Sequence, residues 1–273
     1  MIGQTICSIV TLAVIFWLAF NLEVREMGLG ANLNALMIVL GGTLGATLIA
    51  YPLKKLLWTV QLIKRSFTHR DEIHSTIRTI ANMAHIYRTK GIRALEQEGN
   101  RLPSGLLKTG IELIAYRYTR DKIEQVLHKE ALCTYSKYET CFKILYNMAR
   151  LAPALGLAGT VVNLIRIFGH ISNPQFLIGY MAIALLSTFY GVVLAKVCFV
   201  PLSNKLREFM DQEVLQMDMI HEGILDLNDR EPPRAIHYKL ETLASSMETS
   251  ARRPIRPQLV LRPPYEQPVE IKT

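Results

Sequence analysis

The amino-acid sequence predicts an all-α, polytopic membrane protein with four transmembrane helices and a helical cytoplasmic domain. Half of the 273 residues are hydrophobic, and the mean hydropathy is +0.19, which is too apolar for an ordinary soluble domain. The apolar residues also gather in segments that approach or exceed the roughly 20 helical residues needed to cross a hydrocarbon core. These four segments are Ile2–Leu22, Leu33–Leu53, Leu145–Gly169 and Leu177–Leu202.

The charged residues indicate how the four segments are oriented. Between Lys54 and Lys143 there are 17 Lys and Arg residues against 9 Asp and Glu, whereas the two short linkers, residues 23–32 and 170–176, contain one Arg between them. Cytoplasmic loops of membrane proteins carry the excess of basic residues, so we expect this block and both termini to be cytoplasmic. The net charge of +8 is thus concentrated beside the membrane, and we expect no nucleic-acid partner.

These patterns divide the chain into five parts. We expect two membrane helices with a short periplasmic linker in residues 1–53, a cytoplasmic helical domain in 54–143, a hairpin of the third and fourth membrane helices in 144–202, a cytoplasmic helical extension in 203–250 and a disordered Pro-rich tail in 251–273. A cleaved signal peptide is the alternative for the first segment. That segment has no basic residue ahead of its apolar run, which argues against cleavage.

Apolar residues at three- and four-residue intervals predict two short helices in the cytoplasmic block. The first pattern consists of Ile73, Ile77, Ile80, Ala84 and Tyr87, and the second of Leu107, Ile111, Ile114 and Tyr118. Beyond them, no Pro or Gly interrupts the chain from Arg120 to Pro153, and a helical stripe follows Pro201 up to about Leu227. We therefore expect two long helices that run from the cytoplasm into the bilayer.

The sequence contains little that predicts catalysis. It has no phosphate-binding glycine loop, no G-x-S-x-G motif and no His pair at metal-ligand spacing, so we expect no catalytic residues, no metal site and no cofactor. The cysteines have no short paired spacing, which favours free thiols over a disulfide framework. They are Cys7, Cys133, Cys141 and Cys198.

The membrane hairpin carries polar side chains but no carboxylate. Thr160, Asn163, Thr188 and Tyr190 lie in its apolar segments, and no Asp or Glu occurs between Thr140 and Arg207. Unpaired polar groups are costly in a bilayer, so these side chains should face protein or water. They are either hydrogen-bond partners between helices or the lining of a path for H+ or Na+. In the second case the titrating carboxylate must come from a partner chain.

Several separated motifs resemble one family. LAPALGLAGTVVNLIRIFG, MAIALLSTFYGVVLAKVCFVPLSNKL, LNALMIVLGGTLGATLIAYPLKKLL, GIRALEQEG and GILDLNDREPPRAIHYKLE are similar to MotA/PomA flagellar stator proteins of the MotA/TolQ/ExbB class. The resemblance runs from about Leu33 to Leu243, in the order and spacing of that family.

This resemblance implies a function. Such proteins form a pentamer around a MotB-type, single-span, peptidoglycan-binding subunit whose membrane Asp binds the permeating ion. The complex lies in the bacterial inner membrane and drives the flagellar rotor. By similarity, Thr160 and Thr188 line the ion path, and Pro153 and Pro201 couple ion passage to conformational change. The resemblance also implies that charges near GIRALEQEG contact the rotor switch protein, and these are Glu96, Glu98 and Arg101.

Some residues depart from the family pattern. Arg166 stands where a neutral polar residue is usual, Asn163 where Gly is common, and Lys196 where Asn is frequent. Thr at both 160 and 188 resembles sodium-type members more than proton-type ones, but the nearby Arg166 leaves the ion open. Two other functions also remain open: an ExbB/TolQ-like energiser of a periplasmic partner, and a non-conducting membrane scaffold.

Overall fold

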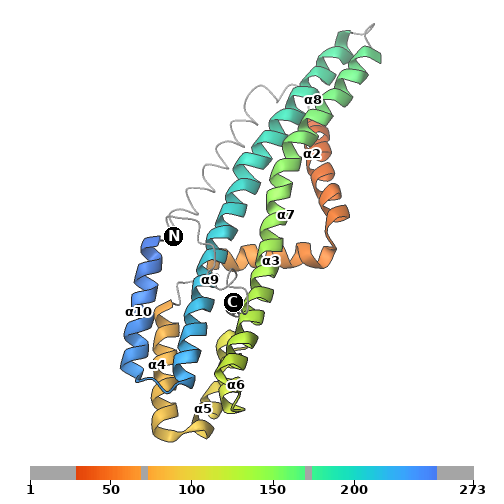
Figure 1. The fold of residues 1–273 in the computed structure, drawn as a ribbon. Coiled ribbons are helices and arrows are strands. Elements are labelled where there is room, and N and C mark those ends of the chain that lie inside the picture. The colour runs from red at the N-terminus through yellow and green to blue at the C-terminus, as the bar shows by residue number, and fades with distance from the viewer. Residues whose placement is uncertain (1–28, 69–72, 170–173, 251–273) are drawn as a thin grey trace, which may run out of the picture. The chain divides into compact units, whose positions relative to one another are not determined.

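The computed structural model describes residues 29–68, 73–169 and 174–250, and every regular element within these residues is a helix (Figure 1). This confirms the all-α part of the predicted fold class. The predicted first membrane segment and the Pro-rich tail lie outside the described residues. In chain order the elements are α2 (Leu29–Ala50), α3 (Leu53–Thr68), α4 (Ile73–Lys90), α5 (Ile92–Gly99), α6 (Leu106–Ala115), α7 (Arg120–Gly169), α8 (Pro174–Val193), the π-helix η1 (Leu194–Phe199), α9 (Val200–Asn228) and α10 (Pro233–Ser250).

The chain folds as two compact units. Unit 1 comprises residues 1–66 and 140–206, and unit 2 comprises residues 67–139 and 207–273. The boundary between them falls within α7 and within α9. The two long helices predicted from Arg120 and from Pro201 are therefore confirmed as continuous helices that extend beyond the apolar segments.

Unit 1 contains the helices that are apolar enough to cross a membrane. The described residues include two such helices, Arg120–Gly169 and Leu177–Asn228, which contain the predicted third and fourth segments. A third span is present if α2 and α3 count as one, although the pair is bent by 115° (Figure 1). Four membrane helices thus remain a prediction.

The second predicted segment ends earlier than the sequence suggested. It was expected to reach Leu53, but α2 ends at Ala50 and α3 leaves in a different direction. The bend falls at Tyr51-Pro52, because Pro52 has no N–H to donate and disfavours the helical conformation for Tyr51. The following helix α3 is amphipathic and carries Lys54 and Lys55 in its first turn.

Helix α2 carries a run of small residues, and other helices cover it only in part. These residues are Gly41, Gly42, Thr43, Gly45, Ala46 and Thr47. Thr43 and Thr47 are buried, and their hydroxyls donate to the carbonyl oxygens one turn earlier over 2.6 Å each. A Cβ on Gly42 would lie 3.2 Å from Leu155 of α7, whereas Gly41 and Gly45 have nothing within 4 Å of that position. Packing within the chain therefore accounts for one side of this small-residue face.

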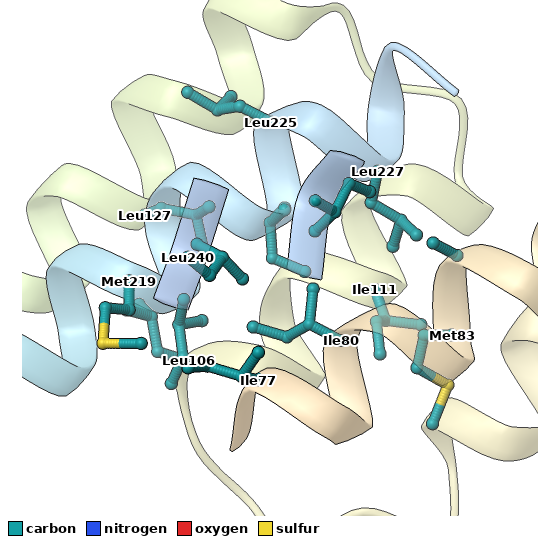
Figure 2. Packing of buried hydrophobic residues seen from close by; sticks show 14 of the residues in the cluster. Ile77, Ile80, Met83, Leu106, Ile111, Leu127, Met219, Leu225, Leu227 and Leu240 are labelled. Atoms are coloured by element: carbon teal, nitrogen blue, oxygen red, sulfur yellow. The ribbon is translucent and has the colours of Figure 1, made fainter. Parts of the chain in front are cut away.

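Unit 2 is built around an apolar core. Its buried side chains come from α4, α5, α6, α10 and parts of α7 and α9, and Figure 2 shows Ile77, Ile80, Leu127 and Leu240 among them. The first predicted apolar face is confirmed, because Ile73, Ile77, Ile80 and Ala84 of α4 are buried and Tyr87 packs against this core.

The second predicted apolar face is right except at its end. Ile111 and Ile114 of α6 are buried and Leu107 packs against the core, but Tyr118 is exposed and lies beyond the helix. Helix α6 ends because Arg117 adopts a positive φ of 56°, and the Tyr118 N–H then donates to the Leu113 carbonyl over 3.1 Å. This left-handed turn is a common way to end a helix, and it removes Tyr118 from the face.

Two glycines allow the helices of unit 2 to approach closely. A Cβ on Gly110 of α6 would lie 2.7 Å from the Ile224 side chain of α9, and one on Gly223 would lie 2.9 Å from the Ile80 side chain of α4. Real Cβ atoms essentially never lie within 3.0 Å of a neighbouring heavy atom, so neither position accepts a side chain without a shift. The absence of a side chain at these positions therefore sets how tightly α6 and α4 pack on α9.

One carboxyl group of α9, that of Asp218, has a raised pKa. Asp218 lies in unit 2, well beyond the apolar segment that ends at Leu202. Burial and, to a smaller extent, the negative charge of Glu222 together raise the pKa of Asp218 to about 7. Burial lowers the pKa of the nearby His221 below its ordinary value, so the imidazole titrates at lower pH.

The raised pKa of Asp218 predicts that the protein becomes less stable as pH rises from about 4 to about 7. In this range the folded state still holds the proton that the unfolded state has released, and above pH 7 both states have released it, so the loss levels off. Between pH 5 and 7, the free energy of unfolding should fall by about 2 kcal/mol from this group. Asp218→Asn should remove this loss, as measured by denaturant unfolding of the purified protein in detergent.

The matched control is Asp121→Asn, which changes an exposed aspartate of α7. This variant should keep the wild-type slope of stability against pH. An unchanged slope in the Asp218→Asn protein would contradict the assignment.

Candidate functional site

The structure brings Thr160 and Thr188 together. Thr160 lies in α7 and Thr188 in α8, and their hydroxyl oxygens are within hydrogen-bonding distance of each other. The Thr160 hydroxyl also lies 3.1 Å from the carbonyl oxygen of Gly156 and 3.2 Å from that of Ala184. Two hydroxyls and two carbonyl oxygens therefore converge at one partly buried point between the helices.

Small residues allow this convergence. A Cβ on Gly191 of α8 would lie 2.7 Å from the Ala152 carbonyl oxygen of α7, and one on Gly156 would lie 2.8 Å from the Ser187 carbonyl oxygen. The two backbones are therefore in direct contact at this crossing. Small residues are common where membrane helices pack, because they let backbones approach this closely.

Asn163 lies one turn beyond Thr160 and is fully buried. Its amide nitrogen donates to the Gly159 carbonyl over 2.8 Å, but its side-chain oxygen Oδ1 has no hydrogen-bond partner among the described residues. A buried acceptor without a donor costs about 1–3 kcal/mol. Asn163 therefore places a free acceptor on the same helix as Thr160.

Tyr190 is also buried, and its ring packs edge-on against that of Phe189 with 5.7 Å between the ring centroids. It follows Thr188 by two residues in α8, and side chains at that spacing project from different faces of a helix. Its place in an ion path stays a prediction.

The two prolines occupy different settings. Pro153 lies within α7 at the helix crossing, where a Cβ on Gly191 would be 3.3 Å from the Pro153 Cα. Pro201 is the second residue of α9 and lies two residues after the end of the π-helical turn η1. Proline lacks an N–H and its ring clashes with a carbonyl one turn earlier, and a π-turn relieves this clash by inserting an extra residue. Both prolines interrupt the hydrogen bonding of their helices.

The predicted rotor-contacting charges lie in unit 2, around the end of α5. Glu96 and Arg101 are exposed, Glu98 is half-buried, and an Arg101 guanidinium nitrogen lies 2.7 Å from a Glu98 carboxylate oxygen. Such an exposed pair contributes little to stability, at most about 1 kcal/mol. The pair instead fixes the orientation of two of the three charges.

Sequence reasoning named the threonines but not the residues that bring them together. Gly156, Ser187 and Gly191 form the crossing, and Ser187 also packs against Gly159. Small residues spaced four apart indicated this crossing in the sequence: residues 152 and 156 in α7, residues 187 and 191 in α8, and residue 195 in η1. Within the residues that the structure describes, no group of three or more His, Cys, Asp or Glu side chains is placed to hold a metal ion.

The fold thus defines an all-helical protein with at least two helices able to cross a membrane. Residues 98–219 match the family model described as the MotA/TolQ/ExbB proton channel family. The chain is 30% identical over 208 residues to motility protein A of Aquifex aeolicus, covering 75% of this chain and 82% of that protein. The chain therefore belongs to the MotA/TolQ/ExbB proton channel family.

Other comparisons agree with this membership. The chain is 28% identical over 217 residues to the chemotaxis protein PomA of Vibrio alginolyticus, covering 79% of this chain and 85% of that protein. A solved structure of the MotAB complex of C. jejuni has the same fold, with a TM-score of 0.77 and 20% identity over 89% of this chain and 96% of that chain.

The helix crossing yields a prediction with an internal control. Gly191→Ala should destabilise unit 1 by about 1–3 kcal/mol, because the added Cβ would overlap the Ala152 carbonyl and force α7 and α8 apart. Gly179→Ala in the same helix meets nothing within 4 Å and should be neutral. Thermal unfolding of the detergent-solubilised protein measures both, and equal melting temperatures for the two variants would contradict the proposed backbone contact.

Proposed function

We propose that this chain is an ion-conducting stator subunit of the bacterial flagellar motor, which couples inward flow of H+ or Na+ to torque on the rotor. The observation that carries the proposal is the meeting of Thr160 and Thr188 at the α7–α8 crossing. Similarity to PomA and to motility protein A supports the same function.

The proposed ion path requires a partner chain. The described residues of unit 1 contain no Asp or Glu, whereas a path for protons or sodium ions normally includes an ionisable group at depth. We propose that a MotB-type, single-span, peptidoglycan-binding subunit supplies a membrane Asp next to the two threonines. The fold shared with the solved structure of the C. jejuni MotAB complex supports such a partner. A pentamer of this chain around the partner belongs to the same proposal.

The proposed location is the bacterial inner membrane, with four membrane helices and both termini in the cytoplasm. The apolar helices α7 and α8 and the family membership support a membrane location. The excess of basic residues between Lys54 and Lys143 supports the proposed orientation.

Torque generation would use the two long helices. In this proposal, a change at the threonine pair alters the helices at Pro153 and at Pro201, where backbone hydrogen bonding is already interrupted. Because α7 and the helix formed by α8, η1 and α9 continue into unit 2, such a change reaches both units along these two helices. Glu96, Glu98 and Arg101 would then contact the rotor switch protein.

The choice between H+ and Na+ depends on the threonine pair. Hydroxyl and carbonyl oxygens are suitable ligands for a small cation, and four of them converge at Thr160. The convergence of these oxygens supports sodium more than protons. Arg166 is exposed near the end of α7 and carries a like charge, which disfavours a cation close to it.

The function is tested by replacing one hydroxyl while keeping the shape of the side chain. Thr188→Val should leave the protein in the membrane at normal amounts but abolish swimming, because the hydroxyl that meets Thr160 is lost. Thr188→Ser keeps the hydroxyl and should retain motility. Soft-agar swimming and membrane immunoblots of the complemented deletion strain measure the outcome.

Two results would contradict the proposal. Full swimming of the Thr188→Val strain would exclude the proposed role of the pair. Normal swimming of the deletion strain itself, combined with a defect in envelope transport, would favour an ExbB/TolQ-like energiser instead.

A further inference from the structure

A second polar site lies in unit 1, away from the threonine pair. It is a cavity of about 380 Å³ where the last turn of α2 meets α7, and its lining includes Tyr51, Asn147 and Arg150. The Asn147 amide nitrogen donates to the Tyr51 hydroxyl oxygen over 2.7 Å. This hydrogen bond holds the end of α2 against α7 beside the 115° bend, so the cavity has a defined shape.

The polar groups of this cavity are mainly hydrogen-bond donors. The Arg150 side chain is exposed and presents a planar set of N–H groups. The Tyr51 hydroxyl accepts from Asn147, which leaves its own proton available to donate. A guanidinium group beside a hydroxyl and an amide suits an oxyanion, and phosphate in particular, because arginine can bind it through two parallel hydrogen bonds.

The charge of the described part of unit 1 also favours the binding of an anion. Its described residues contain no Asp or Glu, so none of the described residues of this unit offers Arg150 a carboxylate. Lys54 and Lys55 lie three and four residues after Tyr51, in the first turn of α3. Two further cations therefore lie close to the cavity along the chain, and none of the residues that line the cavity is acidic.

The surroundings of the cavity are apolar and exposed. In α3, Leu53, Leu57 and Val60 recur at helical spacing, with 65%, 65% and 52% of their surface exposed. Ile49 at the end of α2 is 91% exposed. An amphipathic helix that combines such an apolar stripe with lysines is typical of helices lying in a membrane interface. A ligand here would meet cationic groups and apolar side chains together.

We propose that the cavity formed by Tyr51, Asn147 and Arg150 binds the phosphate of an anionic phospholipid headgroup, while the acyl chains lie along the exposed apolar residues of α2 and α3. The inference rests on the membrane location proposed above but not on ion conduction or torque. Tyr51 and Arg150 lie at corresponding ends of the apolar segments of α2 and α7, where a headgroup is found. Bound lipid then stabilises the bend between α2 and α3.

The test uses the full-length chain purified with its partner subunit in detergent. Native mass spectrometry counts the bound lipid after titration with phosphatidylglycerol or with phosphatidylcholine, whose headgroup has no net charge. The wild-type complex should retain phosphatidylglycerol preferentially. Arg150→Gln should weaken that binding by about tenfold, the loss expected for a charge-assisted hydrogen bond. Arg150→Lys should lie between the two, because it keeps the charge but loses the planar donor set.

The matched control is Arg88→Gln, which removes an exposed arginine of α4 and should bind phosphatidylglycerol as the wild type does. Tyr51→Phe removes one hydroxyl and tests the cavity if Arg150→Gln fails to assemble; it should weaken binding severalfold. Equal phosphatidylglycerol binding by the wild type and both cavity variants would overturn the proposal. Equal retention of phosphatidylglycerol and phosphatidylcholine by the wild type, together with inorganic phosphate binding that Arg150→Gln removes, would overturn the lipid as the ligand and favour free phosphate. Because binding is counted without ion flow, a motility defect does not affect the result.

Discussion

The close approach of α7 and α8 is the constraint on which unit 1 depends. At Gly156 and Gly191 the two backbones touch, and any side chain there would overlap a carbonyl oxygen or the facing backbone. This contact places Thr160 against Thr188 one turn away, and it also places Pro153 beside Gly191. In a bilayer, where apolar burial does not drive helices together, such backbone contact and interhelical hydrogen bonds hold helices in register.

The two units use charge in different ways. Within the described residues, unit 1 has basic side chains but no carboxylate. Unit 2 contains both signs and pairs them internally, as in the contacts of Lys239 with Asp226 and with Glu222 at 2.9 and 3.1 Å. The described part of unit 1 is therefore suited to anionic partners, whereas unit 2 pairs its own charges at these positions.

The helices that connect the units contain their own irregularities. Pro153 interrupts the hydrogen bonding of α7, and the π-turn η1 ahead of Pro201 interrupts the helix that continues from α8 into α9. Each irregularity lies between the threonine pair and the boundary of unit 2. π-Turns and internal prolines are common at functional positions of helices, because they allow a change of direction without unfolding. Their placement is consistent with the proposed coupling.

The sequence by itself determined the class of fold, the long helices and most of their faces, because apolar periodicity and proline or glycine breaks act locally. Periodicity identified the buried face of α4, and it failed only at Tyr118, where a left-handed turn at Arg117 ended α6. The absence of Asp and Glu from the hairpin was also evident from the sequence alone. Only the tertiary structure decided which faces meet: it joined Thr160 to Thr188, turned the chain at Tyr51-Pro52 and formed the Arg150 cavity. These features depend on contacts between residues far apart in the chain, and local sequence patterns do not specify such contacts.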